Sequence, residues 1–255
     1  MRIISLNTWG GRAGKEKLLS FFKTHADTTD IFCLQEIWSA AYNHLEGHLA
    51  GGVKLDNTKI MTNALKEISE VLPGHIAFFR PHHGDFYGLL MLVSKKLNVT
   101  EEGDVFVYKQ RGFIPEGDVG THARNIQYVT VETSNGPFTV INFHGLWNGK
   151  GKTDTEDRIN QSRNILAFTQ KLNGEHILCG DFNLLPDTES LKLFEREGLR
   201  NLVKEYKISS TRTSFYTKPE KHADYMFVTK GVQVKEFTVL PDEVSDHAPL
   251  LVEID

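Results

Sequence analysis

Short apolar runs alternate with amphipathic stretches along the chain of 255 residues, and most of the runs end in polar residues. Residues 15–26 and 60–72 carry apolar side chains at helical spacing, and Pro73-Gly74 ends the second stretch. Apolar segments bounded by turn residues predict buried strands. Expected strands lie at residues 2–6, 30–34, 76–79, 88–94, 105–108, 124–132, 138–143, 177–179, 222–228, 232–239 and 249–254, and further helices at 157–172 and 189–197.

The order of these elements predicts the fold class. Several strands follow one another with connections too short for a helical crossover, such as the turn at residues 134–137. We therefore expect an α/β (α+β) four-layer sandwich, in which two mostly antiparallel sheets pack face to face with helices outside. No internal repeat or low-complexity linker interrupts the chain, so we expect a single catalytic domain over residues 1–255.

Composition narrows the class of protein. The formal net charge is −4, with 29 Lys and Arg against 33 Asp and Glu, so a polyanion would have to meet a local patch or a metal. The two cysteines, Cys33 and Cys179, lie in apolar runs and are expected to be small core residues without a disulfide. The chain shows neither a secretory signal pattern nor an apolar run long enough to span a bilayer, so a cytoplasmic location is expected.

Polar side chains follow the apolar runs in a way that suggests chemistry. In Gly180-Asp181-Phe182-Asn183 an acid and an amide two residues apart point the same way from an extended chain. Taken alone, this pattern fits an ordinary polar turn equally well. The same placement recurs at the ends of other apolar runs, at Asn7, Glu36, His144, Asp224, Asp246 and His247.

If these strand ends converge, four carboxylates share one pocket. Their mutual repulsion and partial desolvation would raise their pKa values, and a hard cation would compensate. Oxygen ligands suit Mg²⁺, Mn²⁺ or Ca²⁺, whereas no Cys/His cluster has zinc spacing. We expect Mg²⁺, with Mn²⁺ as the alternative.

Four motifs in order resemble the endonuclease/exonuclease/phosphatase superfamily: Asn7 after the first strand, Leu34-Gln35-Glu36, Gly180-Asp181-x-Asn183 and Ser245-Asp246-His247. Asn142-x-His144 and Ala223-Asp224 also stand where that family has a strand-borne histidine and a histidine-pairing aspartate. Arg124-Asn125-Ile126 and Arg158-x-x-Gln161 resemble the branch of the 5′-tyrosyl-DNA phosphodiesterases. The resemblance covers residues 5–250 and implies the same four-layer sandwich.

The resemblance also implies roles. Glu36 would be the main metal ligand, with Asn7 and Asp246 binding or ordering the metal. Asp181 would position or deprotonate the attacking water, with Asn183 orienting it. His247, paired with Asp224, would donate to a phosphate oxygen, and His144 would contact phosphoryl oxygens from the other side. Because Asp224 should favour the protonated ring, Asp181 is preferred over His247 as the general base, and the choice stays open.

Candidate substrate-binding residues are Arg124, Trp147, Phe215 and Tyr216. Arg124 would add a charged hydrogen bond, and the three aromatic residues lie among basic residues, which suits stacking on single-stranded nucleic acid. By contrast, His82 and His83 are expected in a solvated loop. The Gly-rich segment at residues 111–120 is either an ordered wall or a mobile lid.

These inferences predict a Mg²⁺-dependent phosphodiesterase that uses direct attack of water, with nucleic acid as the preferred substrate and no obligate protein partner. As a nuclease it would act as an endonuclease or an exonuclease, for example in DNA repair. The alternative enzyme is a lipid or small-molecule phosphoesterase of the sphingomyelinase or inositol-phosphate type. The alternative of another class is a non-catalytic binding module.

Overall fold

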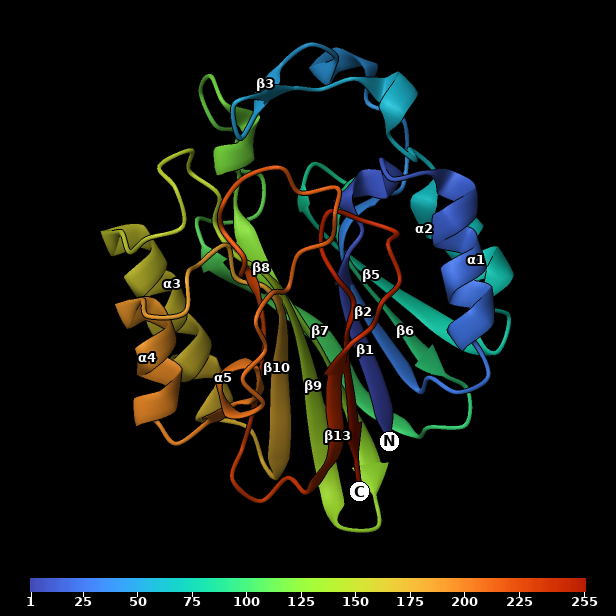
Figure 1. Cartoon of the computed structure of the whole chain (residues 1–255), viewed down its shortest axis with the longest axis vertical. Helices are drawn as coiled ribbons and strands as arrows, with labels where there is room; N and C mark the ends of the chain where they lie inside the picture. Colours follow the sequence, from blue (N-terminus) through green and yellow to red (C-terminus); the bar gives the residue numbers. More distant parts are fainter.

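Two six-stranded sheets form the centre of the protein in a computed structural model that describes residues 1–255 (Figure 1). The first sheet has the strand order β13-β14-β1-β2-β6-β5. All neighbours in it are antiparallel except β1 and β2. Its strands are β1 (Arg2–Asn7), β2 (Ile31–Trp38), β5 (His75–His83), β6 (Tyr87–Ser94), β13 (Val234–Val239) and β14 (Leu250–Ile254).

The second sheet repeats this arrangement, with the order β11-β12-β10-β9-β8-β7 and one parallel pair, β9 and β10. Each parallel pair is joined through a helix, as parallel neighbours require. Its strands are β7 (Val99–Tyr108), β8 (Arg124–Thr133), β9 (Gly136–His144), β10 (Glu175–Asp181), β11 (Arg200–Asn201) and β12 (Asp224–Val228).

Helices cover the outer face of each sheet. Figure 1 shows α1 and α2 beside the first sheet and α3 and α4 beside the second. The α1–α2 side packs a cluster of 17 buried residues, including Phe22 and Ile68, against outward-facing strand residues such as Ile4. The expected four-layer sandwich is confirmed. The helices are α1 (Lys15–His25), α2 (Ala64–Val71), α3 (Glu156–Thr169), α4 (Glu189–Arg196) and α5 (Leu202–Glu205).

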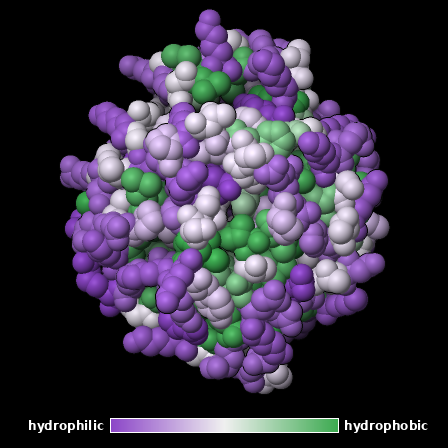
Figure 2. Space-filling model, in the orientation of Figure 1, coloured by the Kyte–Doolittle hydropathy of each residue, from purple (hydrophilic) through white to green (hydrophobic).

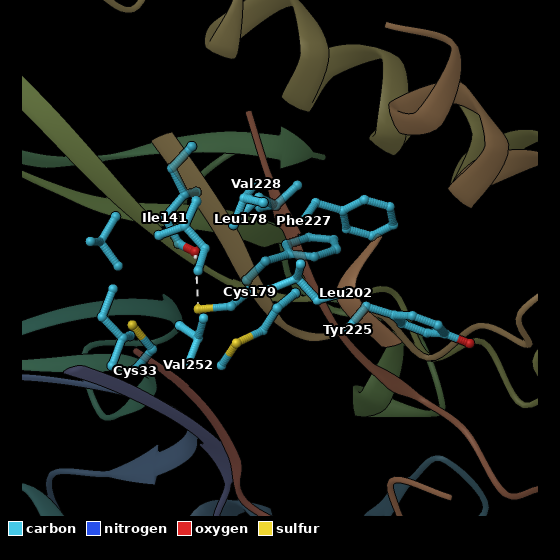
Figure 3. Packing of buried hydrophobic residues seen from close by; sticks show 14 of the residues in the cluster. Cys33, Ile141, Leu178, Cys179, Leu202, Tyr225, Phe227, Val228 and Val252 are labelled. Carbon is cyan, nitrogen blue, oxygen red and sulfur yellow. Dashed lines mark hydrogen bonds between the residues drawn. The ribbon is translucent and has the colours of Figure 1, made fainter. Parts of the chain in front are cut away.

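The main core lies between the sheets and extends beneath α3 and α4, with 34 buried residues. Both cysteines belong to it: Cys33 and Cys179 are free and fully buried, as expected for small core residues (Figure 3). Because successive residues of a strand face opposite layers, central strands covered on both faces are apolar throughout, as Ile3 and Ile4 illustrate. No helix of the protein has the length and apolar character needed to cross a membrane.

An arch of chain between β2 and α2, residues 43–60, crosses above the ends of the strands, and we name it the roof (Figure 1). Its own small apolar cluster includes Leu45, Leu55 and Ile60, packed with Trp38 of β2. The carboxylate of Asp118 accepts hydrogen bonds from the backbone of the β3–β4 turn and so ties the roof to the segment before β8. The roof contains η2 (Asn43–Leu45), β3 (Leu49–Ala50), β4 (Val53–Lys54) and η3 (Asn57–Lys59), and the segment below contains η4 (Val119–Thr121).

Three boundaries differ from the sequence prediction. Helix α2 begins at Ala64 rather than at residue 60, because Ile60 is extended and packs within the roof cluster. Strand β5 continues to His83, so the loop expected after residue 79 is wrong. Strand β7 is an edge strand that begins at Val99, well before the expected residue 105, and its polar first half carried no apolar signal.

Candidate active site

The register of the second sheet sets three polar side chains side by side. In the ladder, Asp181 at the end of β10 pairs with His144 of β9 on one side and with Asp224 of β12 on the other. Residues in register on neighbouring strands point to the same face of a sheet. Gly180 allows this close strand packing, because a Cβ there would overlap the carbonyl oxygen of Phe143. The carboxylate of Asp181 is therefore placed between residues from two other strands.

The first sheet contributes Asn7 and Glu36 to the same place. Strand β2 is irregular between Leu34 and Ile37, and Glu36 has a positive φ of 59°, an uncommon conformation that re-aims its side chain. The amide nitrogen of Asn7 donates to Glu36 Oε1 at 3.2 Å and to Asp181 Oδ2 at 3.0 Å. Asn7 thus joins acids from the two sheets, while its oxygen accepts from the backbone of Trp9.

His247 is held in one orientation by Asp224. Its Nδ1 lies 2.8 and 2.9 Å from the two carboxylate oxygens of Asp224, so this nitrogen donates to Asp224. Nε2 then faces the other acids, 3.6 Å from Asp181 and 3.7 Å from Asp246. Burial and Arg212 favour the neutral ring, but these three carboxylates outweigh them and raise the pKa of His247. The surroundings of His247 therefore favour its protonated ring.

Asp181 and Glu36 have opposite electrostatic environments. Burial alone would raise the pKa of Asp181, but His247, Lys152, His144 and Arg212 together hold it well below its usual value. Burial also raises the pKa of Glu36, and there it prevails with the help of Asp246 against the opposing effect of Arg12. Asp181 is thus stabilised as an anion by the protein itself, whereas at Glu36 burial outweighs the opposing charges of Arg12 and His247.

The residues of the site fit a divalent cation beside Glu36 and Asp246. Oδ1 of Asp246 is buried and accepts no hydrogen bond, and the charge of Asp246 helps to raise the pKa of Glu36. A hard cation would satisfy both observations. Asp181, Asp224 and His247 also place ligand atoms within 4.8 Å of one another. However, both oxygens of Asp224 already face Nδ1 of His247, so this second group is better described as a hydrogen-bonded pair beside an acid.

The predicted substrate-binding residues do not all reach the site. Trp147, Tyr216 and Arg124 line a cavity of about 290 Å³ above the acids. Phe215 does not line it, and packs instead near Trp9 and Lys17. The structure thus sets Phe215 outside the cavity lining: the loop turns between residues 215 and 216, so the two neighbouring rings face different surroundings.

Four cations of the cavity were absent from the predicted site, namely Arg12, Lys152, Arg212 and Lys218. Lys152 is buried, and its Nζ donates to Asn183 Oδ1 at 3.3 Å. Asn183 also donates from its amide nitrogen to Gly145 O, so both ends of the amide are held in place. Arg212 lies 4.0 Å from the ring of Tyr216 and pairs with Asp246, and Arg12 pairs with Glu36. Each comes from a loop or turn, where the sequence shows only a basic residue near an aromatic one.

A row of buried imidazoles extends from His144 toward the roof. Ring centroids are 6.1 Å apart for His144 and His82, 4.8 Å for His82 and His122, and 5.1 Å for His122 and His83. The expectation of a solvated loop at His82 and His83 is wrong, because β5 continues through both and they lie beneath the roof. Burial, reinforced by Arg124, lowers the pKa of all four, and His144 is therefore neutral.

This row predicts a loss of stability in weak acid. The pKa of His83 falls to about 4 in the folded protein, against about 6.5 for an unfolded histidine. The unfolded chain therefore binds more protons between these values, and the free energy of unfolding should decrease as the pH falls from about 6.5 to about 4. Urea unfolding at several pH values measures this slope.

His83→Gln should flatten the slope, whereas His48→Gln, at an exposed position of the roof, should not. A free energy of unfolding that stays level or increases between pH 6.5 and 4.5 would contradict the buried neutral row.

The cavity has two unlike sides. Acids and cations form its floor, and apolar residues of the roof and of η4 form much of its upper wall; these are Leu45, Ala50, Val53, Leu55 and Val119. Gly51 lies so close to Trp147 that a Cβ there would overlap the indole, so the roof touches the far side of the opening. Figure 2 shows the roof as a separate lobe with green apolar residues among purple polar ones. Asp118 and Gly120 make the end of the 111–120 segment part of this wall.

Comparison with known proteins follows this geometry. The model of the Endonuclease/Exonuclease/phosphatase family matches residues 4–247. No curated protein matches the chain by sequence.

Several solved structures share the fold over the whole chain. A mannosyl-6-phosphatase of Bacteroides thetaiotaomicron is 20% identical, with a TM-score of 0.73 and 99% of its chain covered. The human Nocturnin catalytic domain is 19% identical, with a TM-score of 0.67 and 93% covered. A humanized D. rerio TDP2 is 16% identical, with a TM-score of 0.68 and 98% covered. All three alignments include 100% of this chain.

Proposed function

Because the chain belongs to the endonuclease/exonuclease/phosphatase family of metal-dependent phosphoric ester hydrolases, we propose that it hydrolyses a phosphate ester with Mg²⁺ by direct attack of water. One observation carries the proposal. An ionised Asp181 lies between His144 and His247, at 3.7 and 3.6 Å, beside Glu36, whose pKa is raised, and Asp246, whose Oδ1 accepts no hydrogen bond. Glu36 and Asp246 would hold the cation, which would neutralise charge that develops on the phosphoryl oxygens.

The remaining steps use the chain's own residues. Asp181 orients the attacking water; its low pKa makes it a weaker base than an ordinary carboxylate, so positioning is its larger contribution. As the water oxygen bonds to phosphorus, the water gives its proton to the Asp181 carboxylate, and the bond from phosphorus to the leaving oxygen breaks. His247 presents its Nε2 proton to a phosphoryl or leaving oxygen, and Asp224 retains the imidazolium in place. Neutral His144 supplies a hydrogen bond from the opposite side.

The shape and lining of the cavity also indicate which substrates it can admit. The roof approaches Trp147 closely at Gly51, and this narrow opening favours nucleic acid that enters as a single strand or an end. Tyr216 and Trp147 then offer stacking surfaces for bases. A second candidate, a small-molecule phosphate ester, is favoured by the apolar upper wall, which suits a compact organic group. The structural similarity to a mannosyl-6-phosphatase agrees with this second candidate.

A substrate panel tests the proposal. The protein is incubated with Mg²⁺ or with EDTA and with single-stranded and duplex oligonucleotides, 5′-tyrosyl oligonucleotide, a sugar phosphate, sphingomyelin and bis-p-nitrophenyl phosphate. We expect turnover of at least one compact or single-stranded substrate, its loss in EDTA, and its return with added Mg²⁺ or Mn²⁺. A folded sample that binds Mg²⁺ by calorimetry but turns over no member of the panel would show a binding module instead.

A further inference from the structure

Arg124 is a buried cation without an anion. Its side chain is 2% exposed and lines the cavity, and one of its nitrogens, Nη2, donates to Gly120 O at 3.1 Å. Nε and Nη1 are buried without any hydrogen-bond partner. Since Nε carries one N–H and Nη1 carries two, about three donors lack an acceptor.

The groups around Arg124 do not supply the missing charge. Its neighbours His82, His83 and His122 are neutral imidazoles, and Arg124 makes no ion pair with a carboxylate. A buried guanidinium that is neither paired nor fully hydrogen-bonded costs several kcal/mol. A protein keeps such a destabilising residue most readily where a bound ligand removes the free-energy cost.

The side chains that line the cavity also carry more positive than negative charge. Three acids face five basic residues, namely Arg12, Arg124, Lys152, Arg212 and Lys218. Arg12 and Arg212 pair with Glu36 and Asp246, and Lys152 acts on Asp181. A divalent cation would increase the surplus further. One phosphate group carries at most about two negative charges, so a single scissile phosphate leaves this cavity positive.

Arg124 makes no hydrogen bond or ion pair with the acids around Asp181, although its charge acts on His144, Glu36 and Asp181. The cations that act most on Asp181 are His247, Lys152, His144 and Arg212. Arg124 instead lies at the roof end, where Gly120, His122 and His83 line the wall. The unpaired donors therefore form a second polar recess within the same cavity.

We propose that this recess, formed by Arg124, His122 and His83, binds a second phosphate group of the substrate. The recognised ligand is a phosphate ester with two phosphates, either a short nucleic-acid strand whose neighbouring phosphate reaches Arg124 or a compact bisphosphate. The inference rests on the proposed phosphoesterase function, because the first phosphate occupies the site at Asp181.

Binding tests it without turnover. Alkane α,ω-bisphosphonates with two to six methylenes are compared by calorimetry in excess Mg²⁺ with the matching alkyl monophosphonates. A second arm compares a thymidine dinucleotide whose linkage is a hydrolysis-resistant methylenephosphonate, with and without a 5′-terminal phosphonate. We expect the second phosphate to tighten binding about 10- to 100-fold at one spacing, as one charge-assisted contact would. The arm with the larger gain identifies the source of the second phosphate.

Variants test which residues cause the gain in affinity from the second phosphate. Arg124→Gln and His122→Gln should each remove most of the gain, and the second variant serves if the first does not fold. Lys54→Gln, which removes an exposed positive charge from the roof, should retain it.

The proposal fails if no bisphosphonate or 5′-phosphonate dinucleotide binds better than its single-phosphonate partner. It also fails if Arg124→Gln weakens single- and double-phosphate ligands equally, since Arg124 would then serve the scissile phosphate. Neither result depends on hydrolysis, so a failure of the substrate panel is distinguishable from a failure here.

Discussion

Replacing Glu36 with glutamine should lower kcat/KM by at least about a thousandfold, because it removes one of the two acids that would hold the metal. Glutamine has the same shape and can still accept from the amide nitrogen of Asn7. The change therefore tests charge rather than packing. Kinetics on the substrate that the panel identifies, with Mg²⁺ affinity measured by calorimetry, should show both properties decreasing together.

The same variant should leave the metal-free protein as stable as the wild type, or more stable. The raised pKa of Glu36 means that folding disfavours its charge, and glutamine removes that charge along with its repulsion from Asp246. Glu132→Gln, at an exposed position of β8, is the matched control. Activity of Glu36→Gln within about tenfold of the wild type would remove Glu36 from the metal site.

Asp181→Asn should also lower kcat/KM by about a hundredfold to a thousandfold, since the amide can no longer attract the water's proton. Unlike Glu36→Gln, Asp181→Asn should destabilise the folded protein. The low pKa of Asp181 means that the fold stabilises its anion, so the substitution leaves His247 and Lys152 without their acid. Urea unfolding at neutral pH should show a clear loss of stability.

The pH dependence of stability provides a second check that Asp181 stabilises the fold. With its folded pKa below the unfolded value of about 3.9, Asp181 contributes stability that is present above this pH and is lost as the pH falls through the folded value. The difference in stability between wild type and Asp181→Asn should therefore shrink in acid. If Asp181→Asn stabilises the protein and Glu36→Gln destabilises it, the contrast between the two acids drawn above is wrong.

His247→Gln distinguishes the two candidate bases. If His247 acts as a protonated phosphate ligand, its loss lowers activity throughout the pH range below its raised pKa. If it were the base, wild-type activity would instead increase as the pH rises through that pKa, and the variant would lack this increase. The pairing with Asp224 and the three surrounding carboxylates favour the first outcome.

Much of the fold was predictable because its signals are local. Apolar runs with both faces buried marked the central strands, and helical spacing placed α1, α3 and α4 within a few residues of their observed bounds. The predictions failed where an element owes its state to distant partners. Ile60 has a helical pattern, yet the roof cluster keeps it extended, and β5 runs on to His83 because β6 pairs with it that far.

The site divides in the same way. Asp181, His144 and Asp224 end apolar strands, and adjacent strands in register bring such ends together, so a sequence can indicate their meeting. Lys152 and Arg212 come from irregular segments whose path depends on packing, and Phe215 and Tyr216 diverge although they are neighbours in sequence. No local pattern records where such loops turn.

The sequence by itself thus determined the strands, their polar ends and the family, because hydrophobic periodicity and strand-end chemistry are properties of neighbouring residues. Only the tertiary structure decided which charges are paired. Glu36 and Asp181 are both acids near the ends of strands, yet burial disfavours the charge of the first, whereas cations surround the second. Arg124, beneath the roof, forms no ion pair, because electrostatic energy depends on distance and burial rather than on position in the chain.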